Sequence, residues 1–139
     1  MVTFEQKMVI QAPYAKVCAV NSDVGGWKKW DPGIEESSIE GPFASGAKGR
    51  VKLTKGPVID IDIVEVTHPE WMAVEARVRL CHIRFEQNII PAGRETKVRC
   101  KVMLSGPLSS LYGSMVGEKI NLALLRKLAS LRSFCESHR

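Results

Sequence analysis

The chain has 139 residues, of which 45% are hydrophobic and 25% charged, with a formal net charge of +5. This is ordinary for a soluble globular protein and predicts one domain over residues 1–139, large enough for a core without disulfide or metal staples. The positive charges are dispersed and form no basic run with interleaved aromatic residues. We therefore expect no nucleic-acid interface and at most weak peripheral contact with a membrane.

Alternating apolar and polar side chains predict a half-buried strand over residues 2–10. A short helix is expected next, with Pro13 at its first position, where the missing N–H of proline costs nothing. Residues 23–30 predict a second short helical piece, broken at its glycine pair and ended before Pro32.

Six further strands are predicted, separated by turn signals rich in glycine and proline. In the strand predicted over residues 58–67, the apolar side chains change from one face to the other near residues 63–64, which predicts a β-bulge. Strands joined by such short turns form an antiparallel meander with one wet face. The predicted ranges are 34–40, 49–55, 58–67, 71–80, 82–90 and 95–104.

A long amphipathic helix is predicted from Pro107 to Phe134, about 42 Å at 1.5 Å per residue. Laid across one curved antiparallel sheet, such a helix leaves a space that side chains need not fill. The order of elements predicts an α+β fold that holds something apolar. The apolar stripe of this helix consists of Leu108, Tyr112, Val116, Ile120, Leu124, Leu128 and Leu131, and it is widened by Leu111, Met115 and Ala123.

The cysteines and histidines form no recognisable metal or disulfide pattern. The four cysteines are far apart, with no CxxC pair, and the three histidines make no ligand-spaced cluster. The chain opens directly into a strand and contains no apolar run of about 18 residues, so neither a signal peptide nor a membrane-spanning helix is expected. Reduced thiols in a cytoplasmic protein are predicted, with no metal and no cofactor.

Several loose motifs, in this order and spacing, resemble the SRPBCC superfamily, the group of START proteins and birch-pollen allergens, and most closely its polyketide cyclase/dehydrase-like branch. They span nearly the whole chain. They are Ile10-Gln11-Ala12-Pro13, Val17, Asp23, Trp27, Trp30-Asp31-Pro32-Gly33-Ile34, Gly41-Pro42, Gly46 and Gly106-Pro107-Leu108.

The resemblance implies a helix-grip fold, in which a curved antiparallel sheet of about seven strands wraps around the C-terminal helix and encloses a deep hydrophobic cavity. It leaves the function open, because relatives carry lipids or isoprenoid quinones, cyclise aromatic polyketides, bind plant hormones or act as co-chaperones. Relatives often have a tryptophan where this chain has Cys18. The smaller side chain is expected to enlarge the space beside the first helix.

The strand parity and the helix stripe predict which side chains contact an apolar ligand. Trp30 is either a wall or gate at the cavity rim or a plug at one end of the sheet, and the same alternative holds for Trp27. Cys100 is expected to be a small buried apolar residue rather than a nucleophile. The predicted ligand-binding residues are Trp30, Ile61, Met72, Val74, Val78, Val98, Cys100, Val102, Leu108, Tyr112 and Met115.

Three residues are weak catalytic candidates. Asp31 is either a general base in a dry pocket or, because Pro32 follows it, a turn or capping group. If Leu80 faces the cavity, His82, two residues later, faces it too. If Ile83 faces the cavity, its neighbour His82 faces solvent. Tyr112 lies on the helix stripe, where its hydroxyl either meets a ligand carbonyl or stays wet.

An enzyme that moves protons needs at least two polar groups placed near the reacting carbon, and the sequence offers only dispersed ones. Binding of a hydrophobic small molecule (a lipid, an isoprenoid or an aromatic polyketide-like compound) is therefore favoured over catalysis. The alternatives are a polyketide cyclase or dehydratase, and a protein-interaction module whose cavity has collapsed.

Overall fold

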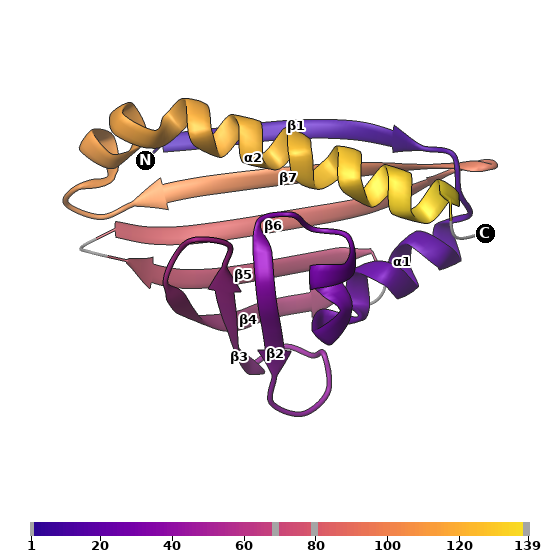
Figure 1. Cartoon of the computed structure of the whole chain (residues 1–139), viewed down its shortest axis with the longest axis horizontal. Helices are drawn as coiled ribbons and strands as arrows, with labels where there is room; N and C mark the ends of the chain where they lie inside the picture. The colour runs from indigo at the N-terminus through magenta and orange to yellow at the C-terminus, as the bar shows by residue number, and fades with distance from the viewer. Residues whose placement is uncertain (1, 68–69, 79–80, 138–139) are drawn as a thin grey trace.

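Seven strands, two α-helices and one short 3-10 helix make up the described part of the chain, which covers residues 2–67, 70–78 and 81–137 of a computed structural model (Figure 1). The elements are β1 Val2–Ile10, α1 Tyr14–Ser22, the 3-10 helix η1 Val24–Lys29, β2 Ile34–Ile39, β3 Lys48–Leu53, β4 Val58–Thr67, β5 Trp71–Val78, β6 Cys81–Ala92, β7 Glu95–Ser105 and α2 Ser109–Ser137.

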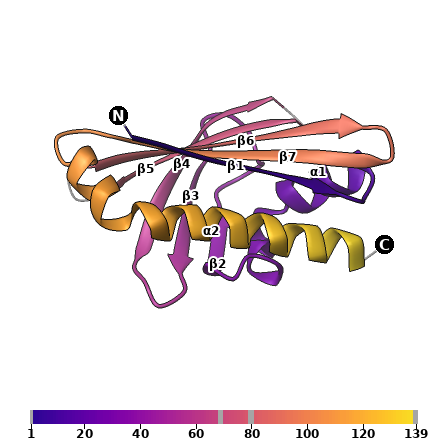
Figure 2. The same cartoon turned by 90° about the horizontal axis from the view of Figure 1, so that it is seen from above.

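The strands form one antiparallel sheet in the order β1-β7-β6-β5-β4-β3-β2. Neighbours in the sheet are consecutive in the chain except at one edge, where β1 pairs with β7 from Val2↔Leu104 to Ile10↔Thr96. The sheet curves, and α2 lies across its inner face with α1 and η1 at one end (Figures 1 and 2). This arrangement confirms the predicted helix-grip fold.

The predicted bulge bends β4 where expected. The pairing of β4 with β5 shifts register between Ile63 and Glu65, which leaves Val64 as the extra residue on the outside of the bend. Ile63 also exchanges backbone hydrogen bonds with Gly46 and Ala47 of the loop before β3, so the bulge anchors that loop.

The predictions for the three helical segments differ from the structure in detail. Pro13 has an extended backbone, with ψ 145°, and α1 begins one residue later at Tyr14. The glycine pair does not break the second helical piece, because η1 runs through it as one 3-10 helix. The last helix begins at Ser109 rather than Pro107, after Gly106 turns the chain with φ +104°.

Two glycines let α2 approach the edge of the sheet closely. A Cβ atom at Gly113 would stand 2.9 Å from Cγ1 of Val2, and one at Gly117 would stand 3.1 Å from the ring of Phe4. Any larger side chain at Gly113 would push the helix away from β1. These two positions therefore fix which face of α2 turns inward.

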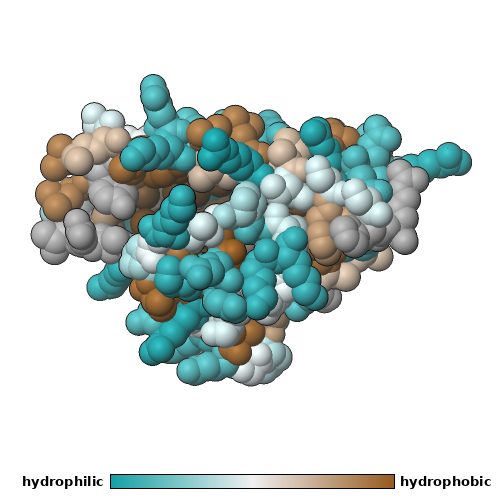
Figure 3. Space-filling view, in the orientation of Figure 1, coloured by the Kyte–Doolittle hydropathy of each residue, from teal (hydrophilic) through white to brown (hydrophobic). Residues whose placement is uncertain are grey.

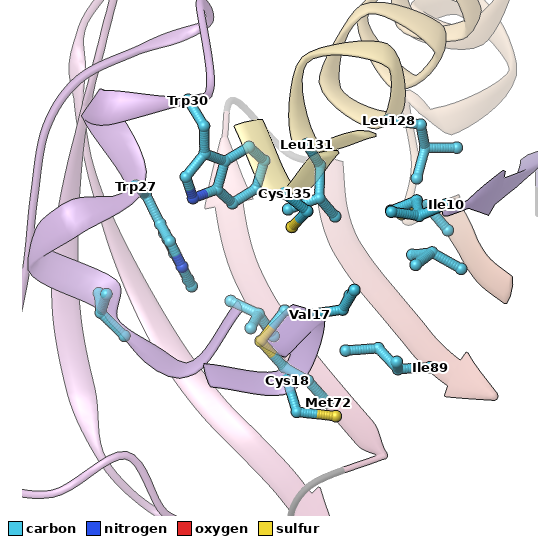
Figure 4. Close-up of a cluster of buried hydrophobic side chains, with 14 of the residues drawn as sticks. Ile10, Val17, Cys18, Trp27, Trp30, Met72, Ile89, Leu128, Leu131 and Cys135 are labelled. Carbon is cyan, nitrogen blue, oxygen red and sulfur yellow. The ribbon is translucent and has the colours of Figure 1, made fainter. Parts of the chain in front are cut away.

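The hydrophobic core is densest under the C-terminal half of α2. Leu128, Leu131 and Cys135 meet residues of β1, α1, η1, β5 and β6 there (Figure 4). Cys18, expected to leave extra space beside α1, is itself buried within this cluster. The fully or almost fully buried members include Ile10, Val17, Cys18, Trp27, Trp30, Met72, Ile89, Leu128, Leu131 and Cys135.

Candidate ligand-binding site

The inner face of the sheet is less completely covered under the N-terminal half of α2. Phe4, Ala76, Phe85 and Val102 pack against the core, yet each stays partly exposed. Phe4 and Phe85 flank Val102 on β1 and β6, so these side chains are neighbours on one face. We call the four residues the open apolar surface. The space-filling view shows a hollow with apolar atoms at its back between α2 and the lower strands (Figure 3).

Two other depressions lie at the opposite end of the molecule, where α2 ends near α1 and η1. Their volumes are about 400 and 210 Å³. Both are lined by Lys29, Trp30 and Phe134. Trp30 is therefore buried between these depressions and the packed core, a position that leaves both interpretations of this residue open.

Most of the predicted ligand-contacting residues belong to the interior. Val102 is part of the open apolar surface, and Val74 pairs with Phe85 beside it. The side chains of Val78 and Tyr112 lie outside the described ones. Trp30, Ile61, Met72, Val74, Val98 and Cys100 are buried.

The structure corrects the prediction for two residues of the predicted helix stripe, one of which, Leu108, precedes α2. Met115 is 72% exposed and Leu108 is exposed as well, so neither faces the interior. Successive helix residues are about 100° apart, and Gly113 and Gly117 occupy the inner side against β1. Met115, two residues from each glycine, is thereby placed on the outer side.

A lysine of α2 forms an ion pair at the boundary between the packed core and the open apolar surface. Nζ of Lys127 lies 2.9 Å from Oδ2 of Asp31, and the two side chains are only 17% and 9% exposed. The ammonium also lies over three aromatic rings, at 4.8 Å from the centroid of Trp30, 5.3 Å from Phe85 and 5.6 Å from Trp27. Cation–π attraction is strongest at such partly desolvated sites.

Asp31 has the turn role that the sequence offered as one alternative, together with an ion pair that the sequence did not predict. Its Oδ1 accepts a hydrogen bond from the backbone N–H of Gly33, as a turn residue does, while Oδ2 pairs with Lys127. The carboxylate is therefore held on both sides and ties the loop before β2 to α2.

A second polar cluster lies deeper, between α1 and the sheet. Asn21 and Gln87 share a buried side-chain hydrogen bond, and Sγ of Cys100 lies 3.5 Å from Oε1 of Gln87. Burial raises the pKa of the Cys100 thiol to about 12, despite the opposing charge of Lys127. A thiol with so high a pKa is protonated at neutral pH.

The sequence reading missed Lys127 and Gln87, although both carry a positional signal. Gln87 lies two residues from both Phe85 and Ile89 on β6 and so shares their inner face of the sheet. Lys127 lies seven residues after Ile120 of the predicted apolar stripe and so shares its side of the helix. The hydrophobic pattern alone does not identify polar residues that lie on the inward side of a strand or helix.

His82 lies on the outer face of the sheet, because its neighbour Ile83 pairs with Ala76 and Leu104 on the inner face. His82 pairs with Arg77 on β5, and Nε2 of His82 lies 2.8 Å from Oε1 of Glu75. Arg84 bridges Glu75 and Glu86 on the same face. Burial raises the pKa of Glu75, but hydrogen bonds and charge from Arg84 and His82 outweigh it and lower that pKa overall. The sheet thus separates His82 from Asp31.

The described residues contain no group of three or more His, Cys, Asp or Glu side chains that could hold a metal ion. Across the same residues, no helix combines the length and apolar character that a membrane span requires.

The family comparison agrees with the fold. Residues 1–133 match the family described as "Polyketide cyclase / dehydrase and lipid transport", and the chain belongs to this family. A search of curated proteins found no match.

Solved structures share the fold at low sequence identity. A START superfamily protein from Mycobacterium smegmatis has a TM-score of 0.78 and 14% identity, with 99% of each chain covered. Norcoclaurine synthase from Thalictrum flavum, in complex with dopamine and hydroxybenzaldehyde, has a TM-score of 0.75 and 14% identity, with 99% of this chain and 88% of that chain covered. The di-domain ARO/CYC protein BexL from the BE-7585A biosynthetic pathway has a TM-score of 0.80 and 14% identity, with 96% and 46% covered.

Proposed function

We propose that this protein binds a hydrophobic small molecule, such as a lipid, an isoprenoid or an aromatic polyketide-like compound, without covalent chemistry. The observation that carries the proposal is the open apolar surface. Phe4, Ala76, Phe85 and Val102 come from four adjacent strands, face the long helix, and still keep part of their surface uncovered. Covering such surface with a ligand is favourable by about 25 cal/mol per Å².

The polar groups of the interior favour binding over catalysis. Asp31 and Lys127 already neutralise each other, Asn21 and Gln87 are hydrogen-bonded to each other, and Cys100 is protonated. Proton transfer on a substrate requires a base and an acid that are free to change partners. The rival function is a cyclase or dehydratase in which Asp31 and Lys127 separate to serve as base and acid. Turnover of a polyketide-like substrate that is abolished in Asp31→Asn would support this rival.

The compartment proposed for this activity is the cytoplasm. All four cysteines are free buried thiols, as is usual in a reducing environment.

The test is binding of the neutral fluorescent reporter N-phenylnaphthylamine, together with native mass spectrometry of protein purified from its source. Ala76→Trp places a bulky ring in the open apolar surface and should weaken reporter binding by about tenfold or more. Ala123→Trp puts the same ring at an exposed position of α2 and should leave binding unchanged. The proposal is wrong if the wild-type protein binds no reporter at micromolar concentration, or if Ala76→Trp binds it equally well.

A further inference from the structure

We infer that the bound molecule carries a neutral oxygen acceptor, such as a ketone, ester or quinone carbonyl, which Lys127 and Trp30 hold at the inner end of the open apolar surface. This inference rests on the proposed function and specifies its ligand. Two observations carry it, one for each donor.

The first donor is the ammonium of Lys127. It has three N–H groups, and within the described residues it donates one hydrogen bond, to Asp31. Aromatic ring faces provide its other contacts. One of these rings is that of Phe85, which belongs to the open apolar surface. The ammonium is thus within reach of a ligand seated on that surface.

The second donor is the indole N–H of Trp30. Trp30 is only 6% exposed, and its Nε1 has no hydrogen-bond acceptor among the described residues. By contrast, Nε1 of the neighbouring Trp27 donates to the backbone oxygen of Asn21 at 2.8 Å. A buried donor without an acceptor is costly, which is why such groups are rare unless another molecule satisfies them. Nζ of Lys127 lies over the ring of Trp30, 4.8 Å from its centroid, so the two donors belong to side chains in contact.

The charge of the site selects a neutral oxygen over a carboxylate. Asp31 already balances Lys127, so an anionic head group would add an uncompensated charge in a largely buried place. A carbonyl oxygen adds no charge, and its two lone pairs can accept from the ammonium and the indole together. Because one donor is charged, the hydrogen bond to it is of the stronger kind.

The experiment compares three ten-carbon probes, a methyl ketone, an alkane and a carboxylic acid, as competitors of N-phenylnaphthylamine. The double variant Asp31→Asn/Lys127→Met removes the charged donor without leaving a single buried charge. The ratio of ketone to alkane affinity should fall by about tenfold in this variant, the effect of one charge-assisted hydrogen bond. Trp30→Phe keeps the ring, removes the N–H and should lower the same ratio about threefold or more.

Lys119→Met, at an exposed lysine of the same helix, is the matched control and should leave the ratio unchanged. The infrared spectrum of an isotope-labelled carbonyl provides a readout in the wild-type protein alone. Hydrogen bonding to an ammonium should shift the carbonyl stretch of the bound ketone below its frequency in hydrocarbon.

Each outcome decides between the two proposals. If the reporter does not bind, the proposed function fails and the inference fails with it. If the reporter and the alkane bind but the ketone ratio is the same in all variants, or the carbonyl stretch is unshifted, the donors are satisfied by water and only the inference is wrong. Tighter binding of the acid than of the ketone at neutral pH would also overturn it.

Discussion

Replacing Lys127 with methionine should destabilise the fold because it leaves the Asp31 carboxylate without its counter-charge. Breaking a fully buried pair costs about 3–5 kcal/mol. The pair here is 17% and 9% exposed, and Gly33 still donates to the carboxylate, so we expect a loss of about 2–4 kcal/mol. Methionine is close in length to the aliphatic part of the lysine side chain, so lost packing should contribute little.

The double variant Asp31→Asn/Lys127→Met should recover most of this loss, because it removes both charges together. We expect its free energy of unfolding to lie within about 1 kcal/mol of the wild-type value. The matched control is Lys28→Met. Nζ of Lys28 lies 3.0 Å from Oε1 of Glu36, but both side chains are largely exposed, so this variant should lose less than about 1 kcal/mol.

Urea unfolding followed by tryptophan fluorescence measures these differences, since Trp27 and Trp30 are both buried in the native state. The slope of the transition should stay constant, so that the midpoints report stability alone. The reasoning is refuted if Lys127→Met loses no more stability than Lys28→Met, or if the double variant is as unstable as the single one.

Further predictions concern the core, a buried thiol and the helix contact. Leu131→Ala should lose about 2–5 kcal/mol in urea unfolding, whereas Leu125→Ala, at a 41% exposed position of the same helix, should lose less than about 1 kcal/mol. The Cys100 thiol should resist iodoacetamide in the native protein and react in urea, as mass spectrometry would report. Because burial raises its pKa from 9.0 to about 12, stability should fall as pH rises between these values, and an unchanged urea midpoint there would contradict this. Gly113→Ala should lower the melting temperature through its contact with Val2, and Val2→Ala should restore it; a stabilising Gly113→Ala would show that the helix shifts freely.

The sheet could be predicted from the sequence because strand periodicity and turn residues are local signals. The clean alternation of apolar and polar residues over 95–104 predicted β7 correctly. The change of the apolar face at residues 63–64 predicted the bulge correctly. Residues that end or begin helices were less well predicted, since Pro13 and Pro107 each precede the observed helix instead of opening it.

The orientation of α2 was predicted in part. Leu124, Leu128 and Leu131 of the predicted stripe are buried, whereas the three residues predicted to widen it, Leu111, Met115 and Ala123, are exposed. Periodicity alone did not fix the edge of the stripe, because the exposed side of α2 also carries the apolar residues Leu122 and Leu125. Gly113 and Gly117 mark the inward side, since their lack of side chains allows contact with β1, a strand distant in sequence. The ion pair of Asp31 and Lys127 depends on the same long-range packing.

The pairing of β1 with β7 has a consequence for how the chain folds. Val2 of β1 pairs with Leu104 of β7, and α2 packs against the same strand through Gly113 and Gly117. During synthesis, the first strand therefore waits for nearly the whole chain to leave the ribosome before it finds its neighbours. Contacts of such long sequence separation slow folding, because the ends of a long loop must come together first. We expect slow folding for a protein of this size, with the edge strand among the last parts to acquire protection from hydrogen exchange.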